Sequence, residues 1–265
     1  MEPVKEPTAT LQDTVDDTVI EAEEKLMSDQ EAKDLIAEVM PPVWEAIDAY
    51  NYAVYTQDLG TISRCARDYA QALTDASTQL SETTGWPDDL KDKVADAAQL
   101  MDFNSGIMVN VANTESVDNI EMIMRSYDTS DAMRDLREAV GLELPATPPA
   151  IEVTDMRTES MDYSDYTKIT FTLRNNIPGL VEEVFINYNI KDASGNIVAT
   201  GQATTNPVHF ESGATAPARS TVKSENLKTG YRVVPVEWQI LHLSNNNSMD
   251  SDQYDSDTVA SFEVK

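Results

Sequence analysis

The spacing of apolar residues changes once along the chain, from a helical repeat to strict alternation, and this change sets the fold class. Up to residue 144 apolar side chains recur every three or four positions, whereas from residue 151 they tend to take every second position. The segment between, "LELPATPPAIEV", holds three prolines and favours a stiff, extended linker. We therefore expect a multidomain chain with a flexible acidic leader at 1–27, an all-α helical bundle at 28–144, a Pro-rich linker at 145–150 and an antiparallel β-sandwich at 151–265.

The first part contains boundary signals for five or six antiparallel helices joined by short turns. Ser28 followed by Glu31 is a capping box that begins the first helix. Pro41 and Pro42 lack backbone donors, so they predict a kink or a break, with Pro42 starting the next segment. Further boundaries are predicted at Gly60, at Pro87 as a first helical position, at Asn113 or Thr114 as an N-cap, and at Gly141 as a C-terminal glycine.

The chain is strongly acidic, with 47 acidic against 19 basic residues and a formal net charge of -28. Such a surface repels nucleic-acid phosphates and anionic lipid head groups, which argues against nucleic-acid binding. Acidity spread along the whole chain indicates solubility in salt, either in the cytosol of a halophile or outside a cell.

Residues 1–27 open on acidic sequence that carries Pro and Thr, and no run of 18 apolar residues occurs anywhere. We expect this leader to be the tether of an extracytoplasmic surface lipoprotein, with its lipid anchor on a segment outside this sequence and no direct membrane insertion. A natural cytosolic tail would have the same composition, so that alternative stays open.

The lone cysteine, Cys65, shares a helical face with Tyr69 and Leu73. A single cysteine excludes an intrachain disulfide and a zinc–thiolate site. We expect Cys65 to pack in the core, and the alternative is a reactive or dimer-forming thiol.

Methionines and aromatic residues in the first part suggest either core packing or a binding groove. Trp44, Tyr50 and Tyr55 are expected to pack, while Tyr52 lies off their stripe and is expected to be exposed. At helical spacing methionine usually fills a core, but it also lines adaptable apolar grooves. The methionines that would line such a groove are Met101, Met108, Met122, Met124 and Met133.

The stretch "YNIKDASGNIVATG", which begins at Tyr188, places polar turn residues between two alternating runs. Asp192 can bond its own backbone and Gly195 allows a positive φ, so the pattern predicts a β-hairpin. Asp192 is the only carboxylate of the loop, and Ca²⁺ prefers six to eight oxygen ligands, so an ion site is disfavoured.

A resemblance to the FxLYD family and related bacterial immunoglobulin-like sandwiches runs from Lys168 to Pro217. It starts in "KITFTLRNN" and ends in "VHFESGATAP", although the literal Phe-x-Leu-Tyr-Asp signature is replaced by "INYNIKD". The resemblance implies an extracytoplasmic β-sandwich on bacterial surface proteins, without catalytic residues. The matching positions are Asn175, Asn176, Tyr188, Asp192, Gly195, Gly201, Ala203 and Gly213.

The sequence beyond Gly213 adds two expected strands, which would make seven, the usual count for an immunoglobulin-like sandwich. Val234, Val236 and Trp238 share one face there, and Pro235 predicts a bulge or a sheet edge. In the first part, "NYAVYTQDLG" is similar to a Tyr-rich helix followed by Thr-x-Asp in actinobacterial lipoproteins.

Residues that could carry chemistry are few. His209 and His242 belong to no metal-binding spacing, and no nucleotide-binding or nucleophile motif occurs, so we expect no catalytic residues and no cofactor. Four carboxylates crowd what we expect to be a loop before the last strand. They are weak calcium candidates, against the alternative of a solvated acidic loop: Asp250, Asp252, Asp255 and Asp257.

These observations favour a non-enzymatic surface protein that serves as a spacer or as a binding module for a protein or glycan at the cell surface. The alternative is a carrier of a small apolar ligand in a groove lined by Met and Tyr in the helical part. A hydrolase with a carboxylate pair between the two parts is a third hypothesis, which no motif supports.

Overall fold

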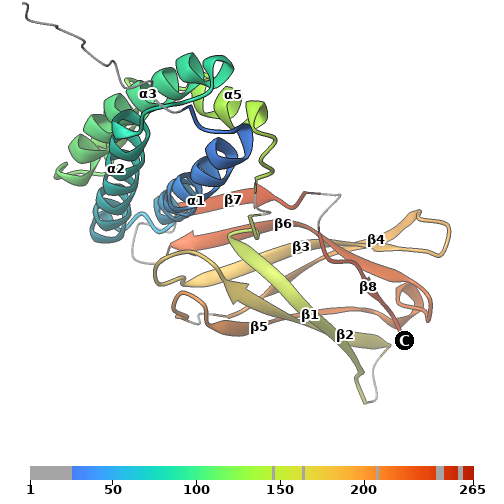
Figure 1. Ribbon diagram of the computed structural model, residues 1–265. Helices are drawn as coiled ribbons and strands as arrows, with labels where there is room; N and C mark the ends of the chain where they lie inside the picture. The colour runs from blue at the N-terminus through green and yellow to red at the C-terminus, as the bar shows by residue number, and fades with distance from the viewer. Residues whose placement is uncertain (1–25, 145–146, 163–164, 207–208, 243–247, 256–258) are drawn as a thin grey trace, which may run out of the picture.

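The computed structural model describes residues 26–144, 147–162, 165–206, 209–242, 248–255 and 259–265. Helices occupy the first part of the chain and an antiparallel sheet the second, as the change of period predicts (Figure 1). The helices are α1 (Asp29–Val54), α2 (Leu59–Glu82), α3 (Asp88–Ala112), α4 (Asp118–Met124) and α5 (Ala132–Ala139). The strands are β1 (Ile151–Ser160), β2 (Tyr166–Asn175), β3 (Glu183–Lys191), β4 (Ile197–Thr204), β5 (Thr215–Lys223), β6 (Arg232–His242), β7 (Ser248–Gln253) and β8 (Phe262–Glu263).

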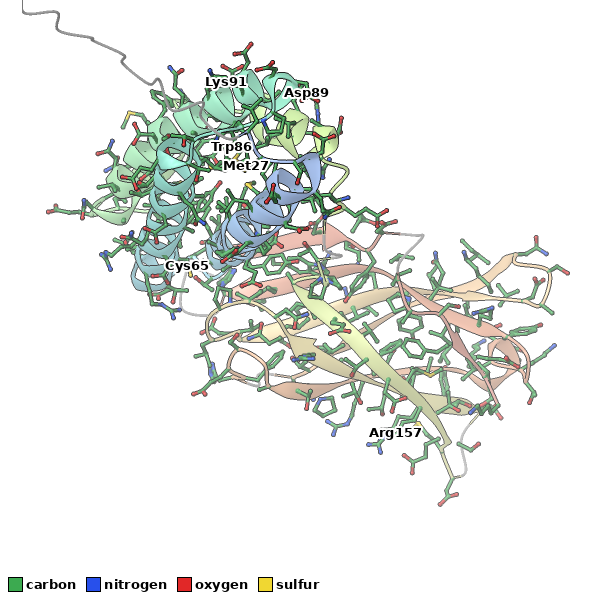
Figure 2. All side chains as sticks on the ribbon, in the orientation of Figure 1. Met27, Cys65, Trp86, Asp89, Lys91 and Arg157 are labelled. Carbon is green, nitrogen blue, oxygen red and sulfur yellow. The ribbon has the colours of Figure 1, made fainter. Side chains whose placement is uncertain are left out.

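Helix α1 begins as the capping box predicts. The Ser28 hydroxyl accepts from the backbone N–H of Glu31 at 3.2 Å, and the Glu31 carboxylate accepts from the Ser28 N–H at 2.8 Å. Met27, the last residue of the predicted leader, is already bonded to the helical part, because its N–H donates to the Gly85 carbonyl at 2.7 Å. Met27 therefore lies beside the turn that carries Trp86, at one end of the bundle (Figure 2).

Of the predicted kink or break at Pro41 and Pro42, the break is wrong, because α1 runs through both prolines without interruption. The prolines remove two intrahelical hydrogen bonds. Val39, Met40 and Val43 lie buried on both sides of them, so packing of this face against the bundle core holds the helix together.

The other helix boundaries follow local signals in part. Cys65 is buried in the core, as expected, and Gly141 has φ +65 just beyond α5. Pro87 precedes the first turn of α3 instead of opening it. The predicted cap at Asn113 or Thr114 is also wrong, because Asn113 closes α3 by donating its N–H to the Val109 carbonyl, and α4 starts only at Asp118.

The strands form one antiparallel sheet in the order β1-β2-β5-β4-β3-β6-β7, with β8 also paired to β6. β4 and β5 share a single residue pair, Thr204 with Arg219, so the sheet turns sharply there into a half-barrel. Its two halves face each other: the rings of Phe171 in β2 and Tyr188 in β3 have centroids 5.3 Å apart. The Tyr188 hydroxyl donates to Ser220 in β5 at 2.9 Å.

The hairpin predicted around Asp192 is confirmed, since β3 and β4 pair in antiparallel register. The Asp192 carboxylate accepts from the N–H groups of Ser194 and Asn196, both at 2.9 Å. Hydrogen bonds from Asn196, followed by those from other turn N–H groups, lower the pKa of Asp192 below its ordinary value. Gly195 supplies the positive φ.

Strand β6 carries the bulge that Pro235 predicts. Asn187 pairs with Glu237 and the next residue, Tyr188, pairs with Pro235, so one residue of β6 is extra. β6 is nevertheless an interior strand, between β3 and β7, and the alternative of a sheet edge is wrong.

Eight strands replace the expected seven within the described residues, because Ser248–Gln253 is the strand β7 and not part of a loop. A loop was expected there because acidic residues occur at alternate positions of this segment. A strand with one unpaired side tolerates charges, and such charges protect an exposed edge from pairing with other chains.

Each part has its own cluster of buried apolar residues, and the end of α1 links them. Tyr52 and Tyr55 belong to α1 and to the turn after it, yet they pack against the sheet cluster. Tyr52 is thus half-buried, which corrects the expectation that it is exposed. The Arg64 guanidinium of α2 adds a hydrogen bond of 2.8 Å to the Pro178 carbonyl. No helix among the described residues is long and apolar enough to cross a bilayer.

Candidate functional site

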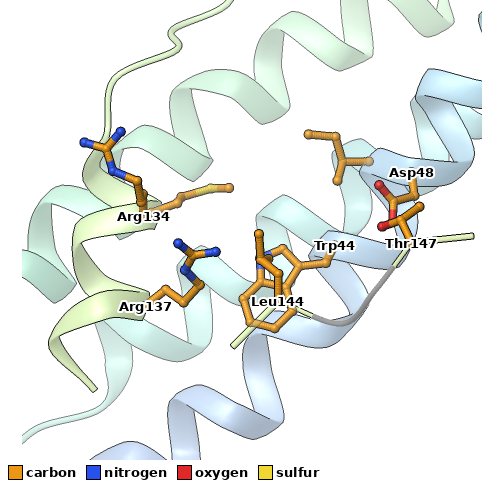
Figure 3. Close-up of a pocket in the computed structure, with 8 residues that line it drawn as sticks. Trp44, Asp48, Arg134, Arg137, Leu144 and Thr147 are labelled. Carbon is orange, nitrogen blue, oxygen red and sulfur yellow. The ribbon is translucent and has the colours of Figure 1, made fainter. Parts of the chain in front are cut away.

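A cavity of about 370 Å³ lies between α1, α5 and the chain that leads from α5 toward β1 (Figure 3). This volume lies within the range of small-molecule sites. The residues that line it are Trp44, Ile47, Asp48, Met133, Arg134, Arg137, Leu144 and Thr147.

Four of these residues give the cavity apolar walls. Trp44 and Ile47 are three positions apart and therefore share one face of α1. Met133 projects from α5, and these three side chains are half-buried against the rim of the bundle core. Leu144 is 54% exposed and forms part of the opening. Apolar side chains that remain partly open to water in this way are typical of a site that binds an apolar body.

Arg137 brings a cation to this apolar surface. Its side chain is only 18% exposed and extends from α5 toward Trp44 and Leu144 (Figure 3). Its terminal nitrogen approaches the Glu138 carboxylate at 3.4 Å, while its buried Nε has no hydrogen-bond partner within the described part of the chain. A buried donor without an acceptor costs about 1–3 kcal/mol, so an acceptor at this position would stabilise the structure.

Arg134, one turn earlier on α5, has a different environment. Its guanidinium lies 2.6 Å from Asp131, 3.6 Å from Asp135 and 3.9 Å from Glu138. Its side chain is 52% exposed. These surface carboxylates offset its charge, so Arg134 adds little positive field to the cavity.

Thr147, which lines the cavity, and its neighbour Pro148 are bonded to α1. The Thr147 hydroxyl donates to the Asp48 carboxylate at 2.7 Å, and the Tyr52 hydroxyl donates to the Pro148 carbonyl. Burial, followed by the nearby Asp48 carboxylate, raises the pKa of Tyr52 to about 12. Two side chains of α1 thus hold this segment in place beside the cavity.

Of the five methionines proposed for an apolar groove, only Met133 lines this cavity. Met101 and Met108 are fully buried in the bundle core, and Met124 is half-buried against it. Met122 is 62% exposed on α4. The tyrosines of that hypothesis also lie elsewhere, since Tyr50 packs in the core and Tyr52 and Tyr55 face the sheet.

The calcium candidates do not gather into a described metal site. Asp250 and Asp252 occur on β7, where Asp250 accepts from Gln57 at 3.1 Å and bonds the His242 Nε2 at 2.9 Å. The Tyr55 hydroxyl lies 3.4 Å from the Asp252 carboxylate. Asp255 is exposed beyond the strand, and Asp257 lies outside the described residues. Among the residues that the structure describes, no three His, Cys, Asp or Glu side chains are grouped to hold a metal ion.

A second, wider cleft of about 640 Å³ lies where the two parts meet. Tyr52 from α1, Glu152 from β1 and Asp252 from β7 line it, together with residues 147–150. Its aromatic residues are already engaged: Trp238 is buried under Tyr55, and the Tyr254 hydroxyl donates to the Ile151 carbonyl at 2.7 Å. Of the two histidines, His242 is buried near β7 and His209 is exposed.

Sequence reasoning missed Arg137, because an arginine on a short polar helix usually indicates a solvated face. The only available signal was a basic residue in a strongly acidic chain, one turn after Met133. That Arg137 lines one cavity with Trp44 depends on the tertiary fold, which periodicity does not specify.

No model of a known protein family matches the chain, and no curated protein matches it. Among solved structures, IrmA from Escherichia coli matches 42% of this chain and 86% of its own at 17% identity, with a TM-score of 0.30. A β-glucuronidase from Bacteroides uniformis matches 40% of this chain and 14% of its own at 13% identity, with a TM-score of 0.23. β-Glucosidase 3B from Thermotoga neapolitana, bound to α-D-glucose, matches 43% of this chain and 16% of its own at 16% identity, with a TM-score of 0.20. These likenesses are too slight to assign a fold family or an activity to the chain.

Proposed function

We propose that the protein is a non-enzymatic binding protein whose helical part carries a small, largely apolar ligand. The observation that supports this proposal is the cavity of about 370 Å³ with Trp44, Ile47 and Met133 in its walls. Trp44 is the one residue of the predicted aromatic cluster that lines it. This function was the alternative hypothesis from the sequence, with the Met- and Tyr-lined groove replaced by a Trp-, Met- and Arg-lined cavity.

Native mass spectrometry of the freshly purified full chain tests this carrier function, because a retained ligand adds a discrete mass. A Trp44→Ala variant should lose that mass, since it removes the largest apolar wall of the cavity. Val54→Ala is the matched control, because Val54 is an exposed apolar residue of α1 that does not line the cavity. Wild-type protein with a clean mass and no thermal shift across a panel of small apolar compounds would contradict the proposal.

We further propose that the second part is an immunoglobulin-like sandwich of the FxLYD type that serves as a spacer. Support comes from the two facing halves of the sheet and from the hairpin around Asp192. A crystal structure of the full chain would test whether residues 147–265 form an immunoglobulin-like sandwich. We expect two sheets packed with their strands about 30° apart, and an open sheet without a second layer would contradict it.

We propose an extracytoplasmic location at the cell surface, with attachment through a lipid outside this sequence. The net charge of -28 and the single, buried cysteine support this location. A protein or glycan at the cell surface would then be the partner of the spacer. Fractionation of native cells should place the protein in the envelope or in the medium, and recovery of the full-length protein from the cytosol would remove the basis for this location.

A further inference from the structure

We infer that the ligand of the Arg137 cavity is an amphipathic carboxylate, with an apolar body between Trp44 and Met133 and its carboxyl group on the Arg137 guanidinium. This inference rests on the proposed carrier function and adds the chemical class of the ligand. It depends on the placement of one incompletely paired cation in an apolar cavity, in a chain with a net charge of -28.

The charges around the cavity single out Arg137. Asp48, the only acidic residue among the described residues that line it, accepts the hydrogen bond of Thr147. Within the described part of the chain, Arg134 has three carboxylates within 4 Å, whereas Arg137 has only Glu138, at 3.4 Å. The Glu138 side chain is itself 61% exposed, so water screens its attraction. Arg137 is therefore the cation in this cavity that is best able to receive an anion.

The geometry of a guanidinium favours a carboxylate. Arginine presents its Nε–H and one terminal N–H side by side, and these two donors match the two oxygens of a carboxylate. In Arg137 the Nε has no acceptor among the residues that the structure describes. Rotation of the guanidinium toward the cavity would pair both donors with one entering carboxylate and would satisfy the buried nitrogen.

The rest of the cavity argues against a doubly charged ligand such as a phosphate monoester. A dianion needs several donors or cations, and the described lining offers one incompletely paired cation among apolar side chains. The acidic surface of the whole chain adds repulsion that grows with ligand charge. A single carboxylate on an apolar body fits both the one cation and the walls formed by Trp44, Ile47 and Met133.

Calorimetric titration of the full chain with three ligands that share one body tests the inference. The probes are 4-phenylbutyrate, 4-phenylbutanol and 4-phenylbutylamine, which are anionic, neutral and cationic at neutral pH. We expect the carboxylate to bind at least tenfold more tightly than the alcohol and the amine to bind most weakly. Added salt should weaken the binding of the carboxylate and leave that of the alcohol almost unchanged.

Variants of the arginines assign the preference to one residue. Arg137→Gln should lower the affinity for the carboxylate to that for the alcohol, while retained alcohol binding shows that the cavity is intact. Arg137→Lys should keep part of the preference, because it keeps the charge but loses the paired donors. Arg125→Gln is the matched control, because Arg125 is exposed, pairs with Glu121 at 2.9 Å and does not line the cavity, and this variant should retain the full preference.

The outcomes separate this inference from the carrier function. Equal binding of carboxylate and alcohol by the wild-type chain would overturn the carboxylate assignment and leave the carrier function standing. If none of the three probes binds, both the carboxylate assignment and the carrier function are contradicted for ligands with a phenylbutyl body. A preference that survives Arg137→Gln, or that disappears in Arg125→Gln, would overturn the role of Arg137. If Arg137→Gln fails to fold, the comparison of probes in the wild-type chain and in Arg137→Lys still decides.

Discussion

The ring of Tyr55, just after α1, meets the indole of Trp238 in β6 edge to face, with ring centroids 4.9 Å apart and an interplanar angle of 90°. This contact places an aromatic residue of the helical part on the core of the sheet. Gln57, two residues later, reaches Asp250 on β7 at 3.1 Å and adopts φ +49, which is unusual for a residue other than glycine. The turn after α1 is therefore shaped by its contact with the sheet.

Tyr55→Ala should loosen the joint between the two parts. Loss of a half-buried aromatic side chain and of its edge-to-face contact should lower the free energy of unfolding by about 2 kcal/mol. We also expect a larger radius of gyration in small-angle scattering, because the variant removes an apolar contact of the joint. Tyr55→Phe is the control, since it keeps the ring and loses only the long hydrogen bond to Asp252. An unchanged radius with lower stability would show that Tyr55 contributes to the core without holding the parts together.

Two glycine-to-alanine substitutions should have opposite effects. A Cβ at Gly201 in β4 would clash with the Tyr188 ring, which is buried and bonded to Ser220. Gly201→Ala should therefore destabilise the protein by about 1–3 kcal/mol. Gly106 in α3 has open space around its Cβ position, so Gly106→Ala should stabilise the helix by about 0.5–1 kcal/mol.

Chemical denaturation of both glycine variants measures these changes. Equal effects of the two substitutions would mean that the Tyr188 ring moves aside to admit the new methyl group at position 201.

Local patterns predicted the parts of the fold that depend on neighbouring residues. The capping box at Ser28, the hairpin at Asp192 and the bulge at Pro235 each rest on contacts within a few residues or on one strand's own chemistry. The continuous helix through Pro41 could not be predicted in this way, because its apolar face is held by packing from other helices. Strand β7 was missed because its acidic residues resemble a loop, and only pairing with β6 makes it a strand.

For the candidate site, only the kind of side chain that lines it could be predicted from the sequence. Methionine and aromatic residues pointed to an apolar site in the helical part, and the structure places one of each in the cavity, Met133 and Trp44. Arg137 could not be predicted, because it comes to line one cavity with Trp44 only in the folded bundle. The contact between Gln57 and Asp250 joins residues 193 positions apart, and no periodic signal spans such a distance.

Ser28→Ala should weaken the start of α1. The substitution removes the hydroxyl that accepts from the Glu31 N–H, and loss of such a cap costs about 1 kcal/mol. Ser81→Ala is the matched control, because Ser81 is an exposed residue inside α2, where alanine is the better helix former. Denaturant titration of both variants should show a loss for Ser28→Ala and no loss for Ser81→Ala. Equal midpoints would mean that the Met27–Gly85 hydrogen bond alone fixes this end of the helix.

The buried Tyr50 should make the protein sensitive to alkaline pH. Burial, followed by the nearby Tyr127, raises the pKa of Tyr50 from 10.0 to about 12. Because the folded-state pKa is the higher one, this contribution to stability is complete below pH 10.0 and is lost as the pH rises through about 12. Tyr50→Phe has no proton to lose, so its free energy of unfolding should fall less steeply with pH than that of the wild type. Relative to the wild type it should gain about 1.4 kcal/mol between about pH 8 and pH 11. Parallel stability curves for the two proteins over this range would show that the hydroxyl of Tyr50 titrates normally in the folded protein.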